Sequence, residues 1–501
     1  MDIGERSLLI GGRWAPSESG KTYRSLDPYT GEVATTAAAA TPVDVEDAVE
    51  AAQNAFPAWA ALPPSKRRHY LLAAADAVEA RAPEIIEAIT SEMGGPSAWG
   101  RYNVKVLVEK LHFAADCSFK GLTGEVIPSE NPSRTMIAIR KPAGVVVSIV
   151  PWNAPALLVG ASVPAALVLG NTVVIKASEQ TPRTHGLVAA CFADAGFPAG
   201  VVNLITNAPE NASGVVEALI AHPSVRRIHF TGSTRIGRII AEKAGTYLKR
   251  VVLELGGKAP CIVLADADLD RAVSAAAFGS FANSGQGCLS TERIIVDRSI
   301  ADKFCRRLAA VAQTVVYGDP RDSRTTLGPL ISRAATERLA ELVEDAVAFG
   351  AELLAGGSAV GNCFAPTVLK GVTPAMRVYQ EESFGPLANI VIVDGVEEAV
   401  RIANDNDYGL SSAIFTRDVT LALDLAKRLN TGISHINGAT LDDEAQIPFG
   451  GVKDSGYGRS GGMAGLEEFT ELQWITIEGP QAQRYPISER PESLSPPPGA
   501  G

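Results

Sequence analysis

The sequence predicts an α/β protein whose helices pack on both faces of parallel sheets. From Val145 onward, short runs rich in β-branched residues alternate with amphipathic helical segments, which is the pattern of strands joined by helical crossovers. A second stretch of the same kind follows Cys288. The 501 residues, of which 46% are hydrophobic and 20% charged, suffice for about two to four domains with large cores.

The predicted elements follow in order along the chain. Alanine-rich segments with apolar residues at helical spacing predict N-terminal helices at residues 42–59, 66–80 and 83–92. Apolar β-branched runs predict strands at 145–150, 172–176, 201–204, 227–230 and 251–255. The segments between them predict helices at 155–167, 183–195, 214–221 and 235–244. The second stretch predicts strands at 294–296, 388–393 and 412–415, and helices at 300–315, 333–349, 396–404 and 420–429.

Charge and composition argue against several classes of protein. The net charge of -11 is the opposite of what a nucleic-acid binder needs. We expect no secretory leader and no membrane contact, because Pro151 interrupts the apolar run at 145–150 and no run reaches the ~20 residues of a membrane span. The six cysteines include no CxxC pair, so we expect free thiols, no metal site and a cytoplasmic location. Residues 486–501, rich in Pro, Ser and Gly, predict a flexible tail.

Cys288 is the candidate nucleophile. It follows Gly285, Gln286 and Gly287 in the segment NSGQGCLSTER, residues 283–293. Glycines let a ligand approach the backbone and leave room around the sulfur, and a nucleophilic thiol must be accessible. The alternative is an unreactive cysteine in an ordinary loop, which is the usual case for a cysteine chosen blindly.

Two polar residues at predicted strand ends could act beside this thiol. Glu254 ends a strand in LELGGKAP, and a carboxylate at the carboxyl end of a parallel strand can serve as a general base. Asn153, in VPWNAP, could donate its amide to an oxyanion. Taken singly, Glu254 could equally face water, and Asn153 could simply close a turn between two prolines.

Two other strand ends indicate a phosphate or ribose ligand. The segment from Gly232 to Gly237 follows a strand and opens a helix, so its free N–H groups could bind a phosphate, although its spacing is not GxGxxG. Lys176 and Glu179, in IKASE, follow another strand. They could contact ribose hydroxyls or form a solvated charge pair.

These motifs together resemble the aldehyde dehydrogenase superfamily over residues 9–477. The matching motifs, in order, are VPWNAP, IKASE, FTGSTRIG, LELGGKAP, NSGQGC, QEESFGP and PFGGVKDSGYGR. The resemblance implies the fold of that family, with a Rossmann-like NAD-binding domain at 1–121 and 143–254 and an α/β catalytic domain at 255–455. It assigns residues 122–142 and 456–480 to a β oligomerisation arm and C-terminal segment, whose strands pair between subunits of a homodimer or homotetramer.

The resemblance also implies a mechanism and a cofactor. Cys288 attacks an aldehyde to give a thiohemiacetal, the Asn153 amide and the Cys288 N–H hold the oxyanion, hydride passes to NAD, and Glu254 activates the water that hydrolyses the thioester. A carboxylate at Glu179 would repel a 2′-phosphate, so we expect NAD over NADP, although Lys176 alone could accept either. The residues implied to bind the cofactor are Trp152, Lys176, Glu179, Gly232, Ser233, Gly237, Leu255, Glu382 and Phe384.

The substrate class rests on a closer resemblance. The run CLSTERIIVD resembles the CMSTER version in salicylaldehyde, benzaldehyde and vanillin dehydrogenases, with Leu289 in place of Met, and the ending GYGRSGGMAGLEEFTELQWITIE resembles that branch too. Ala154, Ala161 and Ala282 are small where aliphatic-aldehyde members carry bulky residues, which leaves volume for an aromatic ring. The predicted substrate pocket consists of Tyr102, Leu158, Ala161, Ala282, Leu289 and Phe449.

The sequence is also compatible with other interpretations. Asp442 and Asp443, on a loop near the predicted pocket, could meet ring hydroxyls or simply face solvent. The enzyme could be an aliphatic or semialdehyde dehydrogenase of the same family. A catalytically silent structural homologue is the remote alternative, against which intact Cys288, Glu254 and Asn153 argue.

Overall fold

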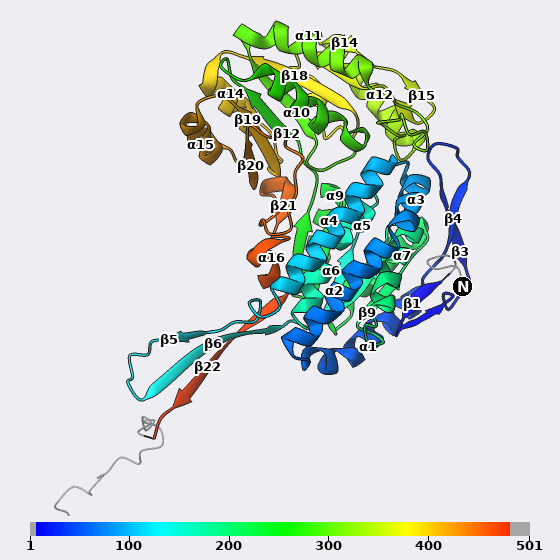
Figure 1. Ribbon diagram of the computed structural model, residues 1–501, viewed down its shortest axis with the longest axis vertical. Coiled ribbons are helices and arrows are strands. Elements are labelled where there is room, and N and C mark those ends of the chain that lie inside the picture. Colours follow the sequence, from blue (N-terminus) through cyan, green and yellow to red (C-terminus); the bar gives the residue numbers. More distant parts are fainter. Residues whose placement is uncertain (1–6, 481–501) are drawn as a thin grey trace, which may run out of the picture.

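Two α/β bodies and a projecting β arm make up the chain (Figure 1). The computed structural model describes residues 7–480, so the predicted tail at 486–501 lies outside the described residues. Within residues 7–480, every helix is too short or too polar to cross a lipid bilayer.

The first body is built on a twisted sheet with the strand order β2-β1-β9-β8-β7-β10-β11-β21. Its central strands β7 to β11 run parallel, while β1 and β21 are antiparallel to their neighbours at the two sides. The parallel strands are apolar and mostly buried, as expected of a sheet covered on both faces. The strand bounds are β1 Leu8–Ile10, β2 Arg13–Ala15, β7 Val145–Ile149, β8 Thr172–Lys176, β9 Val202–Ile205, β10 Val225–Thr231, β11 Arg250–Glu254 and β21 Gly456–Tyr457.

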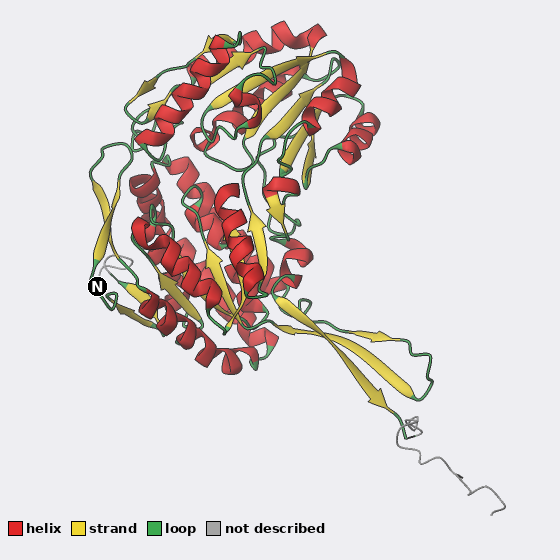
Figure 2. Cartoon of the chain, turned by 180° about the vertical axis from the view of Figure 1, so that it is seen from behind, coloured by secondary structure: helices red, strands yellow, loops and turns green. Residues whose placement is uncertain are grey.

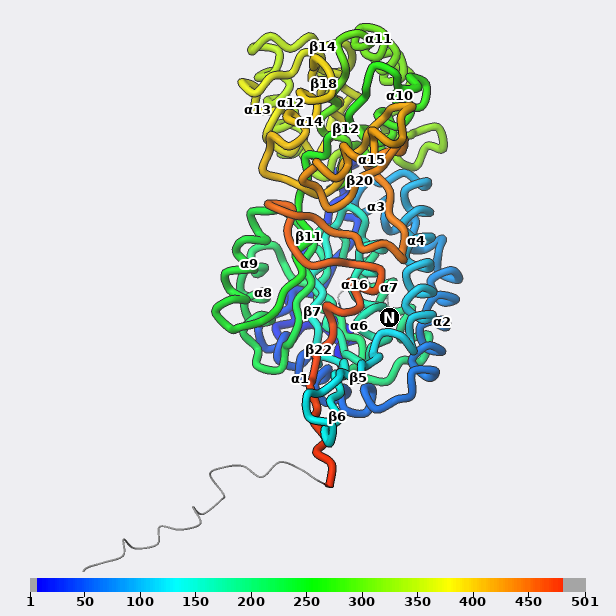
Figure 3. Tube along the Cα trace, turned by 90° about the vertical axis from the view of Figure 1, so that its left-hand side faces the viewer, coloured from blue at the N-terminus to red at the C-terminus, as the bar shows by residue number. Residues whose placement is uncertain are grey.

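Helices cover both faces of this first sheet, because successive side chains of a strand point to opposite sides. Val146 packs with one layer of helices, and Val145 and Val147 pack with the other. The two layers lie on either side of β7 and β11 in Figure 3. One layer contains α2 Pro64–Ala80, α3 Ala82–Met93, α4 Ser97–Asp116, α5 Pro155–Val159, α6 Val163–Val168 and α7 Pro182–Asp194. The other contains α1 Pro42–Ala60, α8 Ala212–Ala221 and α9 Thr234–Thr246.

The second body repeats this layering around a sheet with the order β14-β17-β18-β13-β12-β19-β20. Every pairing in it is parallel except that of the edge strand β14. The strands are β12 Ala259–Val263, β13 Thr291–Asp297, β14 Glu352–Ala355, β17 Thr367–Lys370, β18 Leu387–Val393, β19 Ser411–Phe415 and β20 Ile433–Ile436. Helices α10 Leu269–Phe281 and α11 Arg298–Thr314 cover one face, and α12 Arg333–Ala348, α14 Gly395–Asn404 and α15 Val419–Arg428 cover the other. The short helix α13 Arg377–Gln380 precedes β18.

The arm is a three-stranded antiparallel sheet of order β22-β6-β5 that extends away from both bodies (Figure 2). Its strands are β5 Glu125–Ile127, β6 Arg134–Pro142 and β22 Thr470–Glu478, and helix α16 Gly462–Glu467 leads into β22. Two small hairpins complete the structure, β3 Thr22–Leu26 with β4 Val33–Ala38 and β15 Ala359–Val360 with β16 Cys363–Phe364.

The predicted elements are present, with one correction. The single helix predicted at 155–167 is wrong: it is two short helices, α5 and α6, separated at Gly160–Ser162. Pro164 lies in the first turn of α6, where its missing N–H costs nothing, but it could not continue a helix from α5. The domain boundaries drawn from the sequence stay a prediction.

The topology indicates where a ligand should bind. From β7 the chain moves outward through β8 and β9 and then returns to the other side of β7 with β10 and β11. Open α/β sheets bind ligands at such a reversal, beyond the carboxyl ends of the strands. Glu254 ends β11, and the chain then enters β12 of the second body within a few residues. The site is therefore expected between the two bodies.

Candidate active site

A cavity of about 300 Å³ lies where the carboxyl ends of β7, β10 and β11 meet the loop that precedes β13. It brings together Asn153, Glu254 and Cys288, the three predicted catalytic residues. The predicted cofactor residues outside its lining are Lys176, Glu179 and Gly237. Its lining is Pro151, Trp152, Asn153, Thr231, Gly232, Ser233, Glu254, Leu255, Gly256, Cys288, Glu382 and Phe384.

The loop that carries Cys288 has an unusual backbone that the small residues make possible. Asn283, Ser284 and Gly285 have φ values of 50°, 56° and 69°, in the left-handed region. A Cβ on Gly285 would lie 2.1 Å from the carbonyl oxygen of Gly385, so only glycine fits there. The Gln286 side chain secures the loop by accepting a hydrogen bond from Ile331 N at 2.9 Å. The half-buried thiol of Cys288 is thus presented from a loop that is packed against Gly385 and tied to Ile331.

Asn153 is fixed to this loop through both of its polar ends. Its side-chain Nδ2 donates to the carbonyl oxygen of Gln286 at 3.1 Å. Its backbone oxygen accepts from Trp99 Nε1 at 2.9 Å and from Asn283 Nδ2 at 3.1 Å. A primary amide has two N–H donors, and the bond to Gln286 uses one. The Asn153 side chain therefore ties its own segment to the Cys288 loop, and its second N–H remains for a ligand.

Burial raises the pKa of the acidic groups that line the cavity. Burial, and then the nearby carboxylates of Glu382 and Glu254, raise the pKa of the Cys288 thiol to about 12. Burial also raises the pKa of Glu254 well above its ordinary value, against the opposing effect of a hydrogen bond from Ser460. Perturbed groups of this kind, facing one cavity, are typical of active sites. The prediction that Glu254 faces the shared site agrees with this geometry, and its alternative, a strand-end acid in water, is wrong.

The remaining wall of the cavity is held by a buried ion pair that sequence reasoning missed. Lys258 Nζ lies 2.7 Å from Glu292 Oε2, with both side chains almost completely buried. Glu292 Oε1 accepts hydrogen bonds from Ser383 N at 2.9 Å and Phe384 N at 3.0 Å. Phe384 has a φ of 49°, a strained value for a non-glycine residue. The pair therefore clamps the segment that presents Glu382 and Phe384 to the cavity.

Lys176 and Glu179 lie beyond the cavity at the end of β8 and bind each other. Their side chains form an ion pair, and Glu179 Oε1 also accepts from Asn207 Nδ2 at 3.0 Å. Burial acts to raise the pKa of Glu179, but the ion pair with Lys176 outweighs it and leaves that pKa lowered. Lys176 itself is buried, so the expected alternative of a fully solvated pair is wrong.

Gly237 and Ser233 have different surroundings on helix α9. Ser233 is the N-cap of α9, and its Oγ accepts from Ile236 N at 3.4 Å. Gly237 lies inside the helix, where a Cβ would be 2.4 Å from the side chain of Leu255. Gly237 therefore lets α9 pack closely on Leu255, and a contact with a cofactor stays a prediction.

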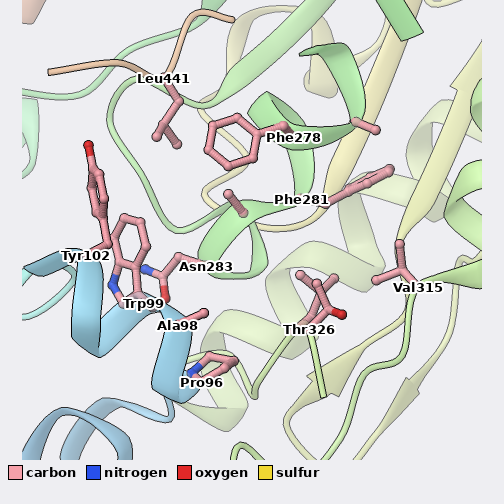
Figure 4. Close-up of a pocket in the computed structure, with 13 residues that line it drawn as sticks. Pro96, Ala98, Trp99, Tyr102, Phe278, Phe281, Asn283, Val315, Thr326 and Leu441 are labelled. Atoms are coloured by element: carbon pink, nitrogen blue, oxygen red, sulfur yellow. The ribbon is translucent and has the colours of Figure 1, made fainter. Parts of the chain in front are cut away.

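A second cavity, of about 360 Å³, opens between α4 and α10 and is mainly aromatic and aliphatic. Figure 4 shows Trp99 and Tyr102 projecting from α4 toward Phe278 and Leu441. Trp99 and Tyr102 stack with ring centroids 5.4 Å apart. Its lining is Pro96, Ala98, Trp99, Tyr102, Ala277, Phe278, Phe281, Ala282, Asn283, Val315, Thr326, Leu327 and Leu441.

Some of the predicted substrate residues line this cavity, and the others pack in the apolar clusters beside it or elsewhere. Tyr102 and Ala282 line it, whereas Leu158, Ala161, Leu289 and Phe449 do not. Leu158 packs with Tyr102 in one small apolar cluster, Leu289 and Phe449 pack with Ala282 and Cys288 in another, and Ala161 is buried near α5. Ala154 belongs to the first of these clusters. The second of these clusters includes Cys288 itself.

The two aspartates of the neighbouring loop behave differently. Asp443 forms a nearly buried ion pair with Lys110, at 3.1 Å, so the expectation that it faces solvent is wrong. Asp442 is exposed. Within residues 7–480, no group of three or more His, Cys, Asp or Glu side chains is placed to hold a metal ion.

Comparison with known proteins agrees with this geometry. The sequence matches the aldehyde dehydrogenase family over residues 14–475. It is 50% identical to a vanillin dehydrogenase of Pseudomonas fluorescens, over 96% of this chain and 99% of that protein. It is 40% identical to a Pseudomonas putida protein named benzaldehyde dehydrogenase [NAD(+)], over 94% of this chain and 96% of that protein.

A solved structure agrees as well. The crystal structure of a salicylaldehyde dehydrogenase from Pseudomonas putida G7, complexed with salicylaldehyde, superposes with a TM-score of 0.93 at 43% identity and covers 96% of this chain and 99% of that chain. Motifs, fold and a cavity that gathers a thiol, an amide and a carboxylate agree with these matches. The chain belongs to the aldehyde dehydrogenase family.

Proposed function

We propose that the protein oxidises aromatic aldehydes to carboxylates, with Cys288 as the nucleophile and NAD as the hydride acceptor. The observation that carries this proposal is the single cavity in which Cys288, Asn153 and Glu254 meet, in a chain that belongs to the aldehyde dehydrogenase family. Each of the three comes from a different segment, and no purely structural role explains why they converge on one cavity.

The first chemical step belongs to Cys288 and Asn153. The sulfur of Cys288 attacks the aldehyde carbon, and the carbonyl oxygen becomes an oxyanion in a thiohemiacetal. The free N–H of the Asn153 amide and the backbone N–H of Cys288 would donate to this oxyanion. Because the pKa of the thiol is raised to about 12, the resting residue is a thiol, and its proton passes to solvent water as the sulfur attacks. When bound, NAD supplies the hydride acceptor that converts the thiohemiacetal to a thioester.

The second chemical step belongs to Glu254. Water attacks the thioester carbon, Glu254 accepts a water proton, and the carboxylate product leaves as the C–S bond breaks. Glu254 must be ionised to act as this base. Since burial raises its pKa, we expect hydrolysis to become faster as the pH rises and the Glu254 carboxylate forms.

Several features of the structure suit a dinucleotide in the cavity. Ser233 caps α9 at the edge of the cavity, and a helix N-terminus favours a phosphate. A Cβ on Gly256 would lie 2.6 Å from Glu382 Oε2, so glycine keeps this wall open beside a carboxylate able to accept ribose hydroxyls. Trp152 and Phe384 meet edge to face, 5.7 Å between ring centroids, and offer an apolar wall to a planar ring.

The choice of NAD over NADP rests on Glu179. Its lowered pKa keeps it ionised, and a carboxylate at the ribose hydroxyls would repel a 2′-phosphate. The ion pair with Lys176 offsets part of that repulsion. We therefore propose a preference for NAD rather than an absolute exclusion of NADP, consistent with the cofactor in the name of the Pseudomonas putida benzaldehyde dehydrogenase.

The aromatic substrate class rests on the cavity between α4 and α10. Its stacked pair Trp99 and Tyr102, together with Phe278 and Leu441, suits a flat ring. Asn283 connects this cavity to the reacting centre, because it lines the cavity and also donates to the backbone of Asn153. The relatives named vanillin and salicylaldehyde dehydrogenases support the same class.

A substrate panel tests the proposal directly. We expect kcat/KM for vanillin, salicylaldehyde and benzaldehyde to exceed that for hexanal and succinic semialdehyde by about 10-fold or more, and NAD to outperform NADP. Ala282→Phe should fill the cavity and lower kcat/KM for the aromatic aldehydes by about 10-fold or more, because the added ring takes the space of the substrate. Absorbance of the reduced cofactor gives the rates.

The panel has a matched control and a clear contrary outcome. Ala310→Phe makes the same change on the exposed face of α11 and should leave every rate unchanged. Faster turnover of hexanal or succinic semialdehyde would replace the aromatic assignment with the aliphatic or semialdehyde one. A wild-type protein inactive toward all five aldehydes would favour the silent homologue.

The arm supports a proposal about assembly. Its strand β22 carries Leu472 and Trp474, which are 63% and 67% exposed, and Val126 on β5 is 74% exposed. Large exposed apolar side chains on a projecting sheet are typical of a surface that another chain covers. We propose that the arm pairs with a second copy in a homodimer or homotetramer.

A single charge on the arm should disrupt this assembly. We expect Trp474→Glu to convert the oligomer to monomers, because a carboxylate would be buried unpaired in the interface. Gln473→Glu places the same charge on the adjacent residue, which points to the other side of β22 and already faces Lys141, and should leave the mass unchanged. Light scattering measures the mass, and an unaltered mass for Trp474→Glu would exclude this face as the interface.

A further inference from the structure

Behind Glu254 lies a chain of two hydrogen bonds among three buried side chains. Ser460 Oγ donates to Glu254 Oε1 at 3.2 Å, and Ser460 Oγ lies 2.9 Å from His229 Nε2. Glu254, Ser460 and His229 are 4%, 2% and 1% exposed. In such a dry environment water does not compete with these bonds, and their geometry is correspondingly well defined.

The sheet register places these groups on one face. In the parallel pair β10 and β11, Thr231 lies opposite Glu254 and His229 lies opposite Val252. Residues two apart on a strand point the same way, so His229 and Glu254 share a face of the sheet. Ser460 reaches them from the segment after β21, where its N–H donates to Phe449 O at 2.8 Å. These two hydrogen bonds thus connect the central strands β10 and β11 to the C-terminal segment.

Counting the protons shows which group donates in each of these two hydrogen bonds. A serine hydroxyl has one proton to donate. Burial, and then the charge of Lys110, lower the pKa of His229 to about 4, so its ring is neutral near pH 7. Since Ser460 Oγ uses its one proton to donate to Glu254 Oε1, the bond between Ser460 Oγ and His229 requires the neutral ring to carry its proton on Nε2 and to donate it to Ser460. Glu254 Oε2 is buried and has no hydrogen-bond partner among the described residues, so it is the oxygen left to accept a proton.

We propose that Ser460 and His229 are positioning residues for the hydrolytic step, an inference that rests on the function proposed above. Ser460 holds Glu254 through Oε1 and favours its carboxylate, while His229 directs the Ser460 proton toward Glu254. As the water oxygen attacks the thioester carbon, one water proton moves to Oε2, the C–S bond breaks, and its electron pair leaves on sulfur. The two hydrogen bonds therefore orient Glu254 and favour its carboxylate before the water reacts.

Other charged groups near Glu254 also influence it and must be kept constant in any test. Burial dominates and raises the pKa of Glu254, while Arg459 and Lys110 act to lower it and Asp443 acts to raise it. Lys110 and Asp443 are paired with each other, 3.1 Å apart. None of these groups changes when Ser460 loses its hydroxyl, so a Ser460 variant isolates the hydrogen bond.

The test compares Ser460→Ala with Ser460→Thr in the full-length enzyme with vanillin and NAD. Rapid-quench kinetics separates the burst of NADH, which reports thioester formation, from the release of vanillate, which reports hydrolysis. For Ser460→Ala we expect hydrolysis near pH 7 to slow by about 10-fold. The rise of the hydrolysis rate with pH should move to higher pH by about one pH unit, because a hydrogen bond that favours the Glu254 carboxylate is lost. The burst rate should not change, and Ser460→Thr should behave like the wild type.

A second variant tests the far end of the chain. His229→Leu should shift hydrolysis in the same direction, and the double variant should be no slower than Ser460→Ala alone, because both changes break one chain. Ser148→Ala is the control: Ser148 lies opposite His229 on β7 and is equally buried, but it pairs with Ser162 at 2.7 Å. Its pH profile should match that of the wild type.

The outcomes separate this inference from the function on which it rests. A wild-type enzyme without an NADH burst overturns both. A normal burst combined with an unshifted hydrolysis profile in Ser460→Ala overturns the positioning role alone, as does an additive double variant. A profile shifted equally by Ser148→Ala shows a general structural effect and also overturns it.

Discussion

Replacing Cys288 with alanine is expected to lower aldehyde oxidation by on the order of 10⁴-fold or more. Its sulfur is the one cysteine sulfur in the cavity shared with Asn153 and Glu254, so no neighbouring thiol can replace it. Alanine preserves the backbone of the loop, and affinity for NAD should therefore remain within about twofold of the wild type. NADH formation with vanillin gives the activity, and quenching of tryptophan fluorescence gives the affinity, since Trp152 lines the cavity.

The matched control is Cys117→Ala. Cys117 is buried at the end of α4, outside both cavities. Its replacement should leave turnover intact. Substantial oxidation by Cys288→Ala would refute the assignment of the nucleophile, whereas loss of both activity and NAD affinity would indicate a disrupted loop instead.

Glu254→Gln is expected to stop the reaction after one turnover. Glutamine has nearly the same shape but cannot accept the water proton, so the thioester should accumulate and steady-state turnover should fall by about 10²- to 10⁴-fold. One NADH per active site should still form in a rapid burst. In the wild type the hydrolytic rate should rise with increasing pH, because the raised pKa of Glu254 means that its carboxylate forms only at a higher pH than usual for a glutamate. The variant should lose that rise.

Stopped-flow absorbance and mass spectrometry of the acylated protein check this prediction. Glu344→Gln, an equivalent change on the exposed face of α12, should leave both phases unchanged. Unaltered steady-state turnover in Glu254→Gln would remove this residue from hydrolysis. Loss of the burst would instead place Glu254 in the attack by the thiol.

Most strands and helices could be predicted because the residue types and apolar spacing that indicate them lie within the segment itself. Thr172–Lys176 is an uninterrupted buried strand, and its β-branched residues reveal it directly. Helices α4 and α10 were not predicted, although both are long. Helix α4 mixes polar and apolar residues around its circumference, since its buried residues include Asn103 and Lys110, and periodicity alone does not mark such a helix.

The site was predictable to the extent that its residues stand in motifs. Glu254 and Cys288 were found because glycine-rich segments surround them and resemble a known family. Ser460 and His229 could not be found in that way, because their significance lies in contacts across more than 200 residues of sequence. Glu292 and Lys258 lie inside the same glycine-rich motifs as Cys288 and Glu254, but only the folded chain shows that they face each other.

The walls of the two cavities have no residue in common. The cavity proposed for the dinucleotide is lined largely by loops at the strand ends, and the cavity proposed for the aromatic ring is lined largely by α4, α10 and the loop at Leu441. Asn153 joins them, bonded on its backbone side to Trp99 and Asn283. On the proposed assignment, an evolving lineage could exchange one aldehyde for another by altering the cavity proposed for the aromatic ring and keep its dinucleotide, so long as this asparagine is left alone.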